Sequence, residues 1–263
     1  MANIVLVHGL WMNALCWEHW VERYTAAGHN VIAKSWPGLE DADAVRKDPS
    51  ALEHLGIDEI VEHYEKIMTG LDAPIIIGHS FGALITQVLL DHNFGAAGVS
   101  IDSAPIKGNW ALPWSALKSA FPGLKNPANR HRAVTLTPEQ FHYAFTNTLS
   151  DEESRAAYDR YAVPGPGRPL FQAAFANFNP HAATKIDFHH EGRAPLLVIA
   201  GGKDHVSPPK INRTIARLQA KTQSLTSFAE FPSKSHFILN QPGWEQVADF
   251  VLDWALDPAP LNA

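Results

Sequence analysis

The chain has 263 residues, 46% hydrophobic and 18% charged, enough to bury one sizeable core or two smaller ones. With 21 Lys and Arg against 27 Asp and Glu, the net charge is −6, which argues against nucleic acid or a membrane surface as a partner. The single cysteine, Cys16, excludes an internal disulfide framework and a thiolate metal cluster. It also favours a reducing, cytoplasmic compartment.

The N-terminal residues do not resemble a targeting segment. No cationic start precedes the apolar run at residues 4–7, and this run is too short for the core of a signal peptide. Elsewhere, Gly, Pro or charged residues break every hydrophobic cluster well before the length of about 20 residues that crosses a bilayer. We therefore expect a soluble protein.

Six short runs of aliphatic and β-branched residues are predicted to be strands. Most of them end at Gly, Asp or Ser, and helical patterns separate them, which is typical of βαβ units around a parallel sheet. The pattern therefore predicts an α/β fold with a mostly parallel six-stranded sheet flanked by helices. The predicted strands span residues 4–7, 30–33, 74–77, 97–101, 195–200 and 226–231.

Helices are predicted between these strands because apolar residues recur there at helical spacing. The first of these patterns stops at Gly28, a residue suited to end a helix. Connections of this length between parallel strands are almost always right-handed. The predicted helices span residues 15–27, 56–68, 81–90, 209–218 and 242–256.

The alternation breaks between residues 104 and 193, where aromatic residues are frequent and no convincing buried strand is visible. We interpret residues 105–192 as a helical cap inserted into a core formed by residues 1–104 and 193–263. A second, independent domain is the alternative, but clearer linkers normally flank such a domain.

The sequence Gly78-His-Ser80-Phe-Gly82 follows a predicted strand and opens a predicted helix. A serine in such a sharp turn adopts a strained backbone, and the two glycines let neighbouring segments approach it. The hydroxyl is then exposed above the sheet, beside the N–H groups at the start of the helix. We therefore expect Ser80 to be a nucleophile; an ordinary glycine-rich turn is the alternative.

A serine nucleophile needs a base, and an imidazole with a pKa near 6.5 suits this role. Among 14 histidines, His236 is favoured because it lies in a loop after the last predicted strand and before the final helix. The other histidines are expected to be solvated or structural, and His8 to be a structural hydrogen-bonding residue. No histidine pair has the helical spacing of zinc ligands, so we expect no metal and no cofactor.

The third residue must be a carboxylate that orients the imidazole. Asp204 comes shortly after the predicted strand at 195–200 and 32 residues before His236, and it is the first choice. Asp102, which follows the predicted strand at 97–101, is the alternative. If Asp102 is not catalytic, its expected role is structural, as a carboxylate that organises the end of this strand.

Backbone and aromatic residues complete the predicted site. The N–H groups of Leu10 and Phe81 could form an oxyanion hole, because Leu10 follows the first strand and Phe81 begins a helix. Aromatic side chains supply apolar surface and few charges, which favours apolar acyl or aryl substrates. The side chains expected to bind substrate are those of Trp11, Met12, Trp110, Phe145, Phe175 and Phe237.

These motifs in this order resemble the α/β-hydrolase superfamily, over nearly the whole chain. The resemblance is strongest to its compact branch of plant methylesterases, hydroxynitrile lyases and bacterial esterases. The motifs that carry it are Val7-His-Gly9, Gly78-His-Ser-Phe-Gly82, Gly202-Lys-Asp204 and Ser235-His236. The resemblance implies an α/β-hydrolase fold with a mobile helical cap.

Departures from relatives narrow the implied chemistry. Epoxide hydrolases and haloalkane dehalogenases of this fold have an Asp nucleophile where this chain has Ser80. Hydroxynitrile lyases of this type carry a Lys after the catalytic histidine, where this chain has Phe237. Cofactor-free haloperoxidases share the same catalytic residues, which leaves perhydrolysis as a side activity. Ala83 replaces a glycine of many relatives, a change expected to be neutral.

The sequence therefore predicts a carboxylic-ester hydrolase acting on a small-molecule substrate. Lactone opening or carbon–carbon bond hydrolysis by the same three residues is the alternative within enzymes. A small-ligand receptor with a vestigial triad is the alternative outside them, and a homodimer remains open. A purely structural role is disfavoured, because a strained turn, a loop histidine and a cap all serve one site.

Overall fold

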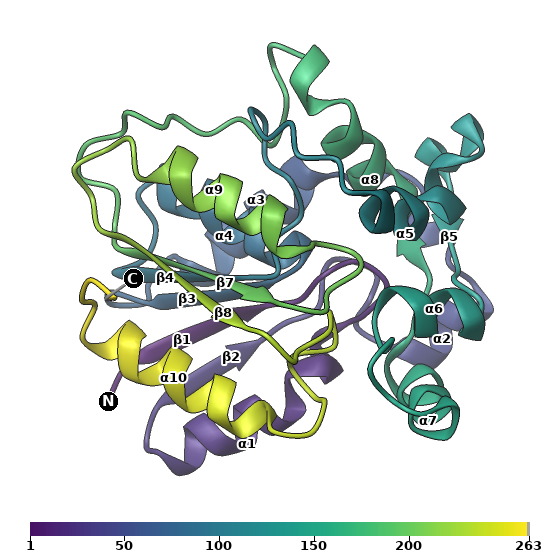
Figure 1. The fold of residues 1–263 in the computed structure, drawn as a ribbon, viewed down its shortest axis with the longest axis horizontal. Coiled ribbons are helices and arrows are strands. Elements are labelled where there is room, and N and C mark those ends of the chain that lie inside the picture. Colours follow the sequence, from purple (N-terminus) through teal and green to yellow (C-terminus); the bar gives the residue numbers. More distant parts are fainter. Residues whose placement is uncertain (262–263) are drawn as a thin grey trace.

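The centre of the computed structural model, which describes residues 1–261, is a six-stranded sheet in which all neighbouring strands are parallel (Figure 1). The strand order is β2-β1-β3-β4-β7-β8. All six predicted strands are confirmed. They are β1 (Asn3–Val7), β2 (Asn30–Ala33), β3 (Ile75–His79), β4 (Ala97–Ile101), β7 (Leu196–Gly201) and β8 (Thr226–Phe231).

The register of the sheet brings the carboxyl ends of its strands to one edge. Val7 at the end of β1 pairs with Gly78 of β3, and His79 at the end of β3 pairs with Ile101. On the other side, Gly201 of β7 pairs with Phe231 of β8. The loops that follow these strands therefore meet at one edge, which is where α/β sheets bind ligands.

Helices cover both faces of the sheet, as the alternating pattern predicts. One face carries α1 and α10, and the other carries α3, α4 and α9 (Figure 1). Helix α4 is buried along nearly its whole length, since it packs on β1, β3 and β4. The helices are α1 (Glu18–Ala26), α3 (Ile57–Met68), α4 (Phe81–Asp91), α9 (Pro209–Gln219) and α10 (Trp244–Leu256); a short helix, α2 (Ala42–Lys47), precedes α3.

Two predicted helix starts are wrong by a few residues. Residues Ala14–Trp17 form a 3₁₀ helix rather than the first turn of α1, because the Asn13 side chain accepts the Leu15 N–H and closes a tight turn. The last helix begins at Trp244 instead of residue 242, because Gly243 has a left-handed backbone with φ of 77°.

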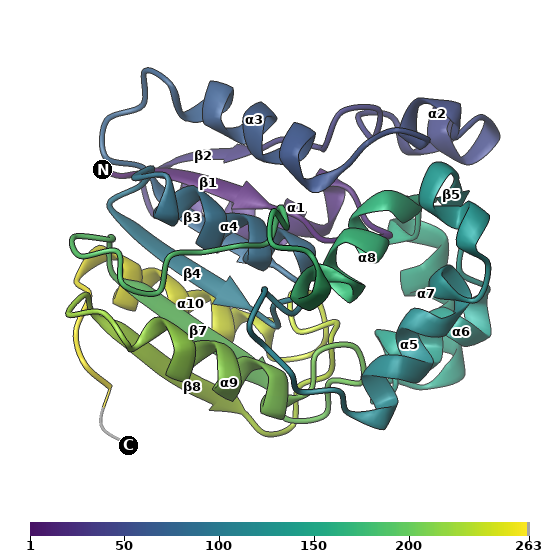
Figure 2. The same cartoon turned by 90° about the horizontal axis from the view of Figure 1, so that it is seen from above.

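The segment between β4 and β7, residues 105–192, is here named the insertion. Its helical part lies beyond the carboxyl ends of the central strands, and its last residues run back to the start of β7 (Figure 2). It is mostly helical, as expected, but the expectation of no strand needs correction, because two-residue strands pair there antiparallel. Its elements are α5 (Trp114–Leu124), β5 (Ala133–Val134), α6 (Pro138–Ala144), α7 (Asp151–Tyr161), β6 (Gly165–Pro166) and α8 (Gly167–Ala174), with 3₁₀ helices at Pro127–His131 and Ala176–Phe178.

Aromatic side chains connect the first helix to the end of the chain. Trp20 is fully buried and donates its indole N–H to the Leu239 carbonyl at 2.9 Å, and the Tyr24 hydroxyl donates to Ala248 at 2.7 Å. These bonds hold the loop after β8 against α1 and α10. In the part of the chain that the structure describes, no helix is long and apolar enough to span a bilayer.

Candidate active site

Ser80 occupies a strained turn between β3 and α4. Its backbone has φ of 58° and ψ of −120°, a left-handed region that non-glycine residues rarely adopt. The side chain is nearly buried, with 3% of its residue surface exposed. The backbone thus holds the Ser80 hydroxyl at the edge where the strands end.

Two flanking glycines make this turn possible. A Cβ at Gly78 would lie 2.2 Å from the Gly82 carbonyl oxygen, and a Cβ at Gly82 would lie 2.0 Å from the Val7 carbonyl oxygen. Both distances are far below van der Waals contact, so any larger residue would push α4 away from β1 and β3. The glycines of the motif therefore serve close backbone packing rather than only a flexible turn.

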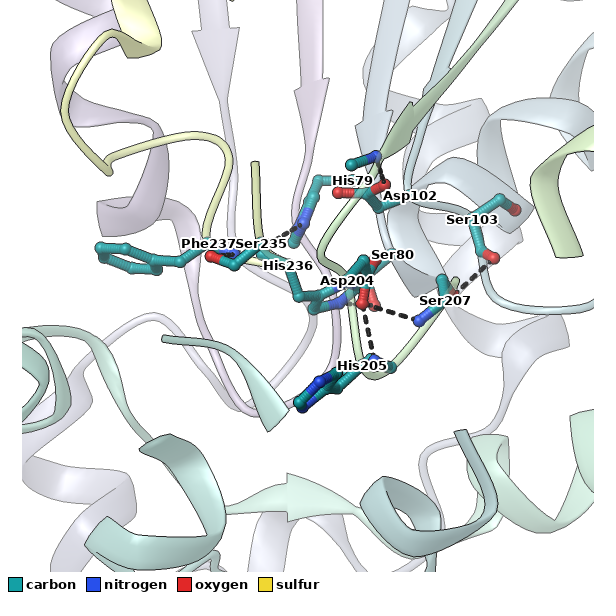
Figure 3. Close-up of polar contacts among 12 residues, drawn as sticks. His79, Ser80, Asp102, Ser103, Asp204, His205, Ser207, Ser235, His236 and Phe237 are labelled. Atoms are coloured by element: carbon teal, nitrogen blue, oxygen red, sulfur yellow. Dashed lines mark hydrogen bonds and ion pairs between the residues drawn. The ribbon is translucent and has the colours of Figure 1, made fainter. Parts of the chain in front are cut away.

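Three side chains from distant parts of the chain form one hydrogen-bonded series (Figure 3). The Ser80 hydroxyl lies 2.9 Å from Nε2 of His236, and Nδ1 of His236 lies 2.7 Å from Oδ2 of Asp204. Because a carboxylate only accepts, Nδ1–H donates to Asp204 and leaves Nε2 to accept the Ser80 proton. The structure thus brings together the serine, histidine and first-choice acid of the sequence prediction.

Asp204 is held by the loop that follows β7. Its Oδ1 accepts the backbone N–H groups of Val206 at 2.6 Å and Ser207 at 2.8 Å. Burial raises the pKa of Asp204, and these N–H donors oppose that rise. Together with His236, three donors point at this carboxylate, so the anion is the form that the loop stabilises.

His236 is buried and uncharged at neutral pH, because burial lowers its pKa far below the usual value. Its loop is held by His79, whose Nε2–H donates to the His236 carbonyl at 2.9 Å. The two rings lie 4.6 Å apart between centroids. Sequence reasoning assigned His79 only a solvated or structural role, and nothing in its motif distinguishes it as the residue that positions His236.

His8 has the structural role that its position after β1 predicts. Its Nδ1–H donates to the Gly9 carbonyl at 2.8 Å, and its Nε2 accepts the Trp36 N–H at 2.9 Å. The ring stacks on that of Trp36 with centroids 4.7 Å apart. These contacts fix the loop that leads from β1 towards Ser80.

Asp102, the alternative acid, is not hydrogen-bonded to His236. Its Oδ1 accepts the Gly201 N–H at 2.6 Å, whereas its Oδ2 has no hydrogen-bond partner within residues 1–261. Burial, followed by the nearby charge of Asp204, raises the pKa of Asp102 well above its usual value. We interpret Asp102 as a neutral carboxylic acid that joins β4 to β7.

These buried groups predict a stability maximum near pH 6.5. Burial lowers the pKa of His8, His79 and His236. Below pH 6.5 the unfolded chain therefore binds protons that the folded chain excludes, and the free energy of unfolding falls by about 1.4 kcal/mol per pH unit for each histidine. The raised pKa values of Asp102 and Asp204 change the free energy of unfolding in the opposite direction. They involve two groups against three histidines, so the histidines determine the sign of the slope below pH 6.5.

Above pH 6.5 the histidine contribution is constant, and the raised pKa values of Asp102 and Asp204 decide the slope. Since the unfolded carboxyl is ionised there, stability should fall as pH rises towards the folded-state pKa. Urea unfolding between pH 5 and pH 9, about the range where these groups titrate, measures both limbs. Asp102→Asn should flatten the alkaline limb and steepen the acid limb, and an unchanged alkaline slope in this variant would contradict the neutral carboxyl.

The backbone segments that carry the two N–H groups of the predicted oxyanion hole, those of Leu10 and Phe81, adjoin Ser80. Phe81 is the first residue of α4, so its N–H has no partner within the helix. Gly9, which precedes Leu10, passes so close to Ser80 that a Cβ there would lie 2.6 Å from the Ser80 Cβ. Backbone from the β1 loop and from α4 thus flanks the serine on two sides.

A cavity of about 300 Å³ opens beside Ser80 and extends beneath the insertion. Among the described residues, no charged side chain and no histidine lines it. The wall contains many small side chains from α5 and α8. The lining residues are Trp11, Ser80, Phe81, Ala104, Pro105, Ala111, Leu112, Ala116, Leu117, Ser119, Ala120, Leu124, Leu170, Ala173, Ala174, Val206, Ser207 and Ile211.

Of the six side chains expected to bind substrate, Trp11 lines this cavity and the other five do not. Met12, Phe145 and Phe237 are buried outside the cavity wall. The ring of Phe145 packs edge to face on His236 with centroids 4.9 Å apart, and Phe237 packs against Phe141 and Tyr161. Trp110 and Phe175 are exposed. The physical reason is volume, because large rings fill space and small residues leave it open. The small residues at 116, 119 and 120, at helical spacing, are the sequence signal that could have predicted this wall.

Potential metal ligands gather only within the same cluster of described residues. His79, Asp102 and His236 each offer an atom within 4.8 Å of the others. However, both ring nitrogens of His236 and one of His79 are already used in hydrogen bonds. The arrangement is therefore a hydrogen-bonded series suited to proton transfer, and the expectation of no metal stays a prediction.

The comparison with protein families decides the membership. A model described as alpha/beta hydrolase family matches residues 4–250. The chain belongs to the alpha/beta hydrolase family. The resemblance and the fold class stated from the sequence are thereby confirmed, and the esterases and hydrolases among the similar proteins agree with an enzyme of this kind.

Similar proteins include named esterases and a named hydrolase. A carbendazim-hydrolysing esterase from Nocardioides sp. is 30% identical over 96 residues, which cover 35% of this chain and about a third (36%) of that protein. A pyrethroid hydrolase from Sphingobium faniae is 17% identical with a TM-score of 0.67, covering 98% of both chains. A methylesterase from Arabidopsis is 15% identical with a TM-score of 0.64, covering 96% of this chain and 98% of that one.

Proposed function

We propose that this protein is a serine hydrolase that cleaves carboxylic esters with neutral, apolar acyl or aryl groups. The observation that carries the proposal is the series of hydrogen bonds from Ser80 through His236 to Asp204, at the end of an uncharged cavity. The esterases among its relatives point to the same reaction class. A cytoplasmic location and a small-molecule partner are part of the proposal.

In the first half of the reaction, Ser80 Oγ attacks the ester carbonyl while its proton moves to Nε2 of His236. The N–H groups of Leu10 and Phe81 would stabilise the oxyanion, and each such donor typically contributes about 10²- to 10³-fold to turnover. As the tetrahedral intermediate collapses, the bond to the alcohol oxygen breaks and His236 returns the proton to that oxygen.

In the second half, His236 takes a proton from water and the resulting hydroxide attacks the acyl-enzyme. The acid is released and Ser80 regains its proton from His236. Asp204 keeps Nδ1 protonated and stabilises the charged imidazolium in both halves. The insertion acts as a cap, because α5 and α8 cover the cavity in which the acyl or aryl group would lie.

The cavity predicts which esters react fastest. Ala120→Phe fills space in the wall of α5, so kcat/KM for p-nitrophenyl esters with long acyl chains should fall about tenfold or more, while the acetate ester is spared. The measurement is a panel of graded acyl length. Ala156→Phe, an exposed alanine on α7, is the matched control and should leave the panel unchanged.

Two results would contradict this proposal. Equal losses for short and long esters in Ala120→Phe would show that the cavity does not hold the acyl group. A wild-type enzyme that strongly prefers lactones or vinylogous diketones over simple esters would overturn the assignment of an esterase in favour of lactone or carbon–carbon bond hydrolysis.

A further inference from the structure

Helix α5 turns small residues towards the protein and large apolar residues towards solvent. Its inward face carries small residues, and Ser119 and Gly123 are buried. Its outward face carries Trp114, Leu117 and Phe121, which lie at helical spacing and are exposed by 42 to 78%. A surface helix normally turns its large apolar residues inward, so this arrangement needs a physical explanation.

The exposed residues of α5 continue into a larger surface, here named the apolar face: Trp110, Leu112, Trp114, Leu117, Phe121 and Phe178. Trp110 and Phe178 contact each other edge to face with centroids 5.8 Å apart. Phe178 ends the 3₁₀ helix that follows α8, and both views place α8 beside α5 (Figures 1 and 2). A cluster of large exposed apolar residues on a soluble protein normally marks an interaction site.

The apolar face is continuous with the cavity that leads to Ser80. Leu112 and Leu117 are both exposed and both contribute to the cavity lining. An apolar molecule that leaves a contact on this face would therefore meet apolar side chains all the way to the serine. Helix α5, which carries three residues of the face, lies beyond the carboxyl ends of the central strands (Figure 2).

The two chain segments that carry this face differ in charge from the whole chain. Residues 103–138 and 162–186, which carry all six residues of the apolar face, contain seven Lys and Arg and no Asp or Glu. Within residues 1–261, Arg168 is the only one of the seven that pairs with a carboxylate, that of Glu59. The remainder of the chain is strongly acidic. The net charge of −6 is therefore the sum of two basic segments and an acidic remainder.

We infer that the apolar face docks on an anionic lipid surface, with its aromatic rings among the headgroups and acyl chains and its basic side chains on the phosphates. Trp and Phe beside Lys and Arg are the composition of segments that lie at a membrane interface. Basic residues near anionic lipid are attracted to its phosphates. The expectation from net charge of no membrane contact does not apply to this region.

A second copy of the chain fits this face less well than lipid. In a symmetric dimer the face would contact itself, which would bring two sets of basic side chains together with no carboxylate from these segments to compensate them. An anionic lipid surface supplies the opposite charge. Lipid docking would also place the cavity mouth against the phase in which neutral apolar esters dissolve.

Cosedimentation of the full chain with vesicles tests the inference. The wild type should bind phosphatidylglycerol vesicles and bind phosphatidylcholine vesicles much more weakly, and added salt should release it. Trp114→Ser/Phe121→Ser should weaken binding to phosphatidylglycerol by about tenfold or more. Lys125→Glu/Arg130→Glu should weaken it by a similar factor through charge.

Matched controls lie outside the apolar face. Leu256→Ser removes an exposed apolar side chain from α10, and Arg217→Glu reverses an exposed charge on α9; both should bind as the wild type does. Equal binding to both lipids, or no binding to phosphatidylglycerol, would overturn the inference. So would a dimer in sedimentation velocity that Trp114→Ser/Phe121→Ser dissociates, because the face would then be an interface between copies. These readouts do not depend on ester hydrolysis.

Discussion

Replacing Ser80 with alanine should leave the fold intact and lower kcat/KM for activated esters by about 10⁴- to 10⁶-fold. The variant loses the oxygen that lies 2.9 Å from His236 Nε2 and that would attack the carbonyl. Alanine retains a Cβ, so the strain of the left-handed turn at φ of 58° is the same in both proteins. Turnover of p-nitrophenyl acetate and thermal unfolding together measure the two expectations.

A second readout separates loss of the nucleophile from loss of substrate binding. A phosphonate ester should add one adduct to the peptide that contains Ser80 in the wild type and none in Ser80→Ala, as measured by mass spectrometry. Ser103→Ala is the matched control, because Ser103 is buried nearby and bonds to Ala104 and Gln87 instead of His236. A wild type without any adduct would favour the receptor alternative, and an active Ser80→Ala would exclude Ser80 as the nucleophile.

The assignment of Asp204, and not Asp102, as the carboxylate that orients His236 predicts the second large loss of activity. Asp204→Asn should lower kcat/KM by about 10⁴-fold, because an amide can donate to Nδ1 of His236 and favour the tautomer in which Nε2 cannot accept the Ser80 proton. Asp102→Asn should stay within about tenfold of the wild type, since a neutral amide replaces a neutral carboxylic acid of similar shape. Steady-state kinetics on one ester compares them directly.

Comparing Asp204→Asn with Asp102→Asn also tests whether a general loss of packing explains the lower activity. Both carboxylates are fully buried near the same edge of the sheet, so a general loss of packing would affect both variants alike. The result that would reverse the assignment is a severe loss in Asp102→Asn with little change in Asp204→Asn. Thermal unfolding of both variants shows whether either loss comes from destabilisation of the fold.

Much of this site could be predicted because its chemistry depends on local sequence signals. Gly78 and Gly82 flank the serine at the positions where only glycine avoids a clash with neighbouring backbone. Asp204 and His236 follow the last two strands, and carboxyl ends of parallel strands meet at one edge. These signals require only the order of strands and turns, which hydrophobic patterning shows well.

The substrate wall could not be predicted in the same way. Phe145 and Phe237 have the composition expected of a substrate pocket, yet both pack into the interior, and the cavity is bounded by residues such as Ala116, Ala120 and Ala173. Aromatic residues suit both cores and pockets, so their presence does not say which way they point. Empty volume is a property of several elements together and has no counterpart in the sequence of one of them.

By itself, the sequence determined the class of fold, the strained serine turn and the candidate nucleophile, base and acid, because each depends on local backbone geometry or on strand order. Tertiary structure alone decided the charge state of Asp102 and the support of His236 by His79, since burial and contact between distant segments set both. It also decided that the large apolar residues of α5 face outward. Hydrophobic periodicity places such residues on one face of a helix, and only the packing of the neighbouring elements decides which face meets solvent.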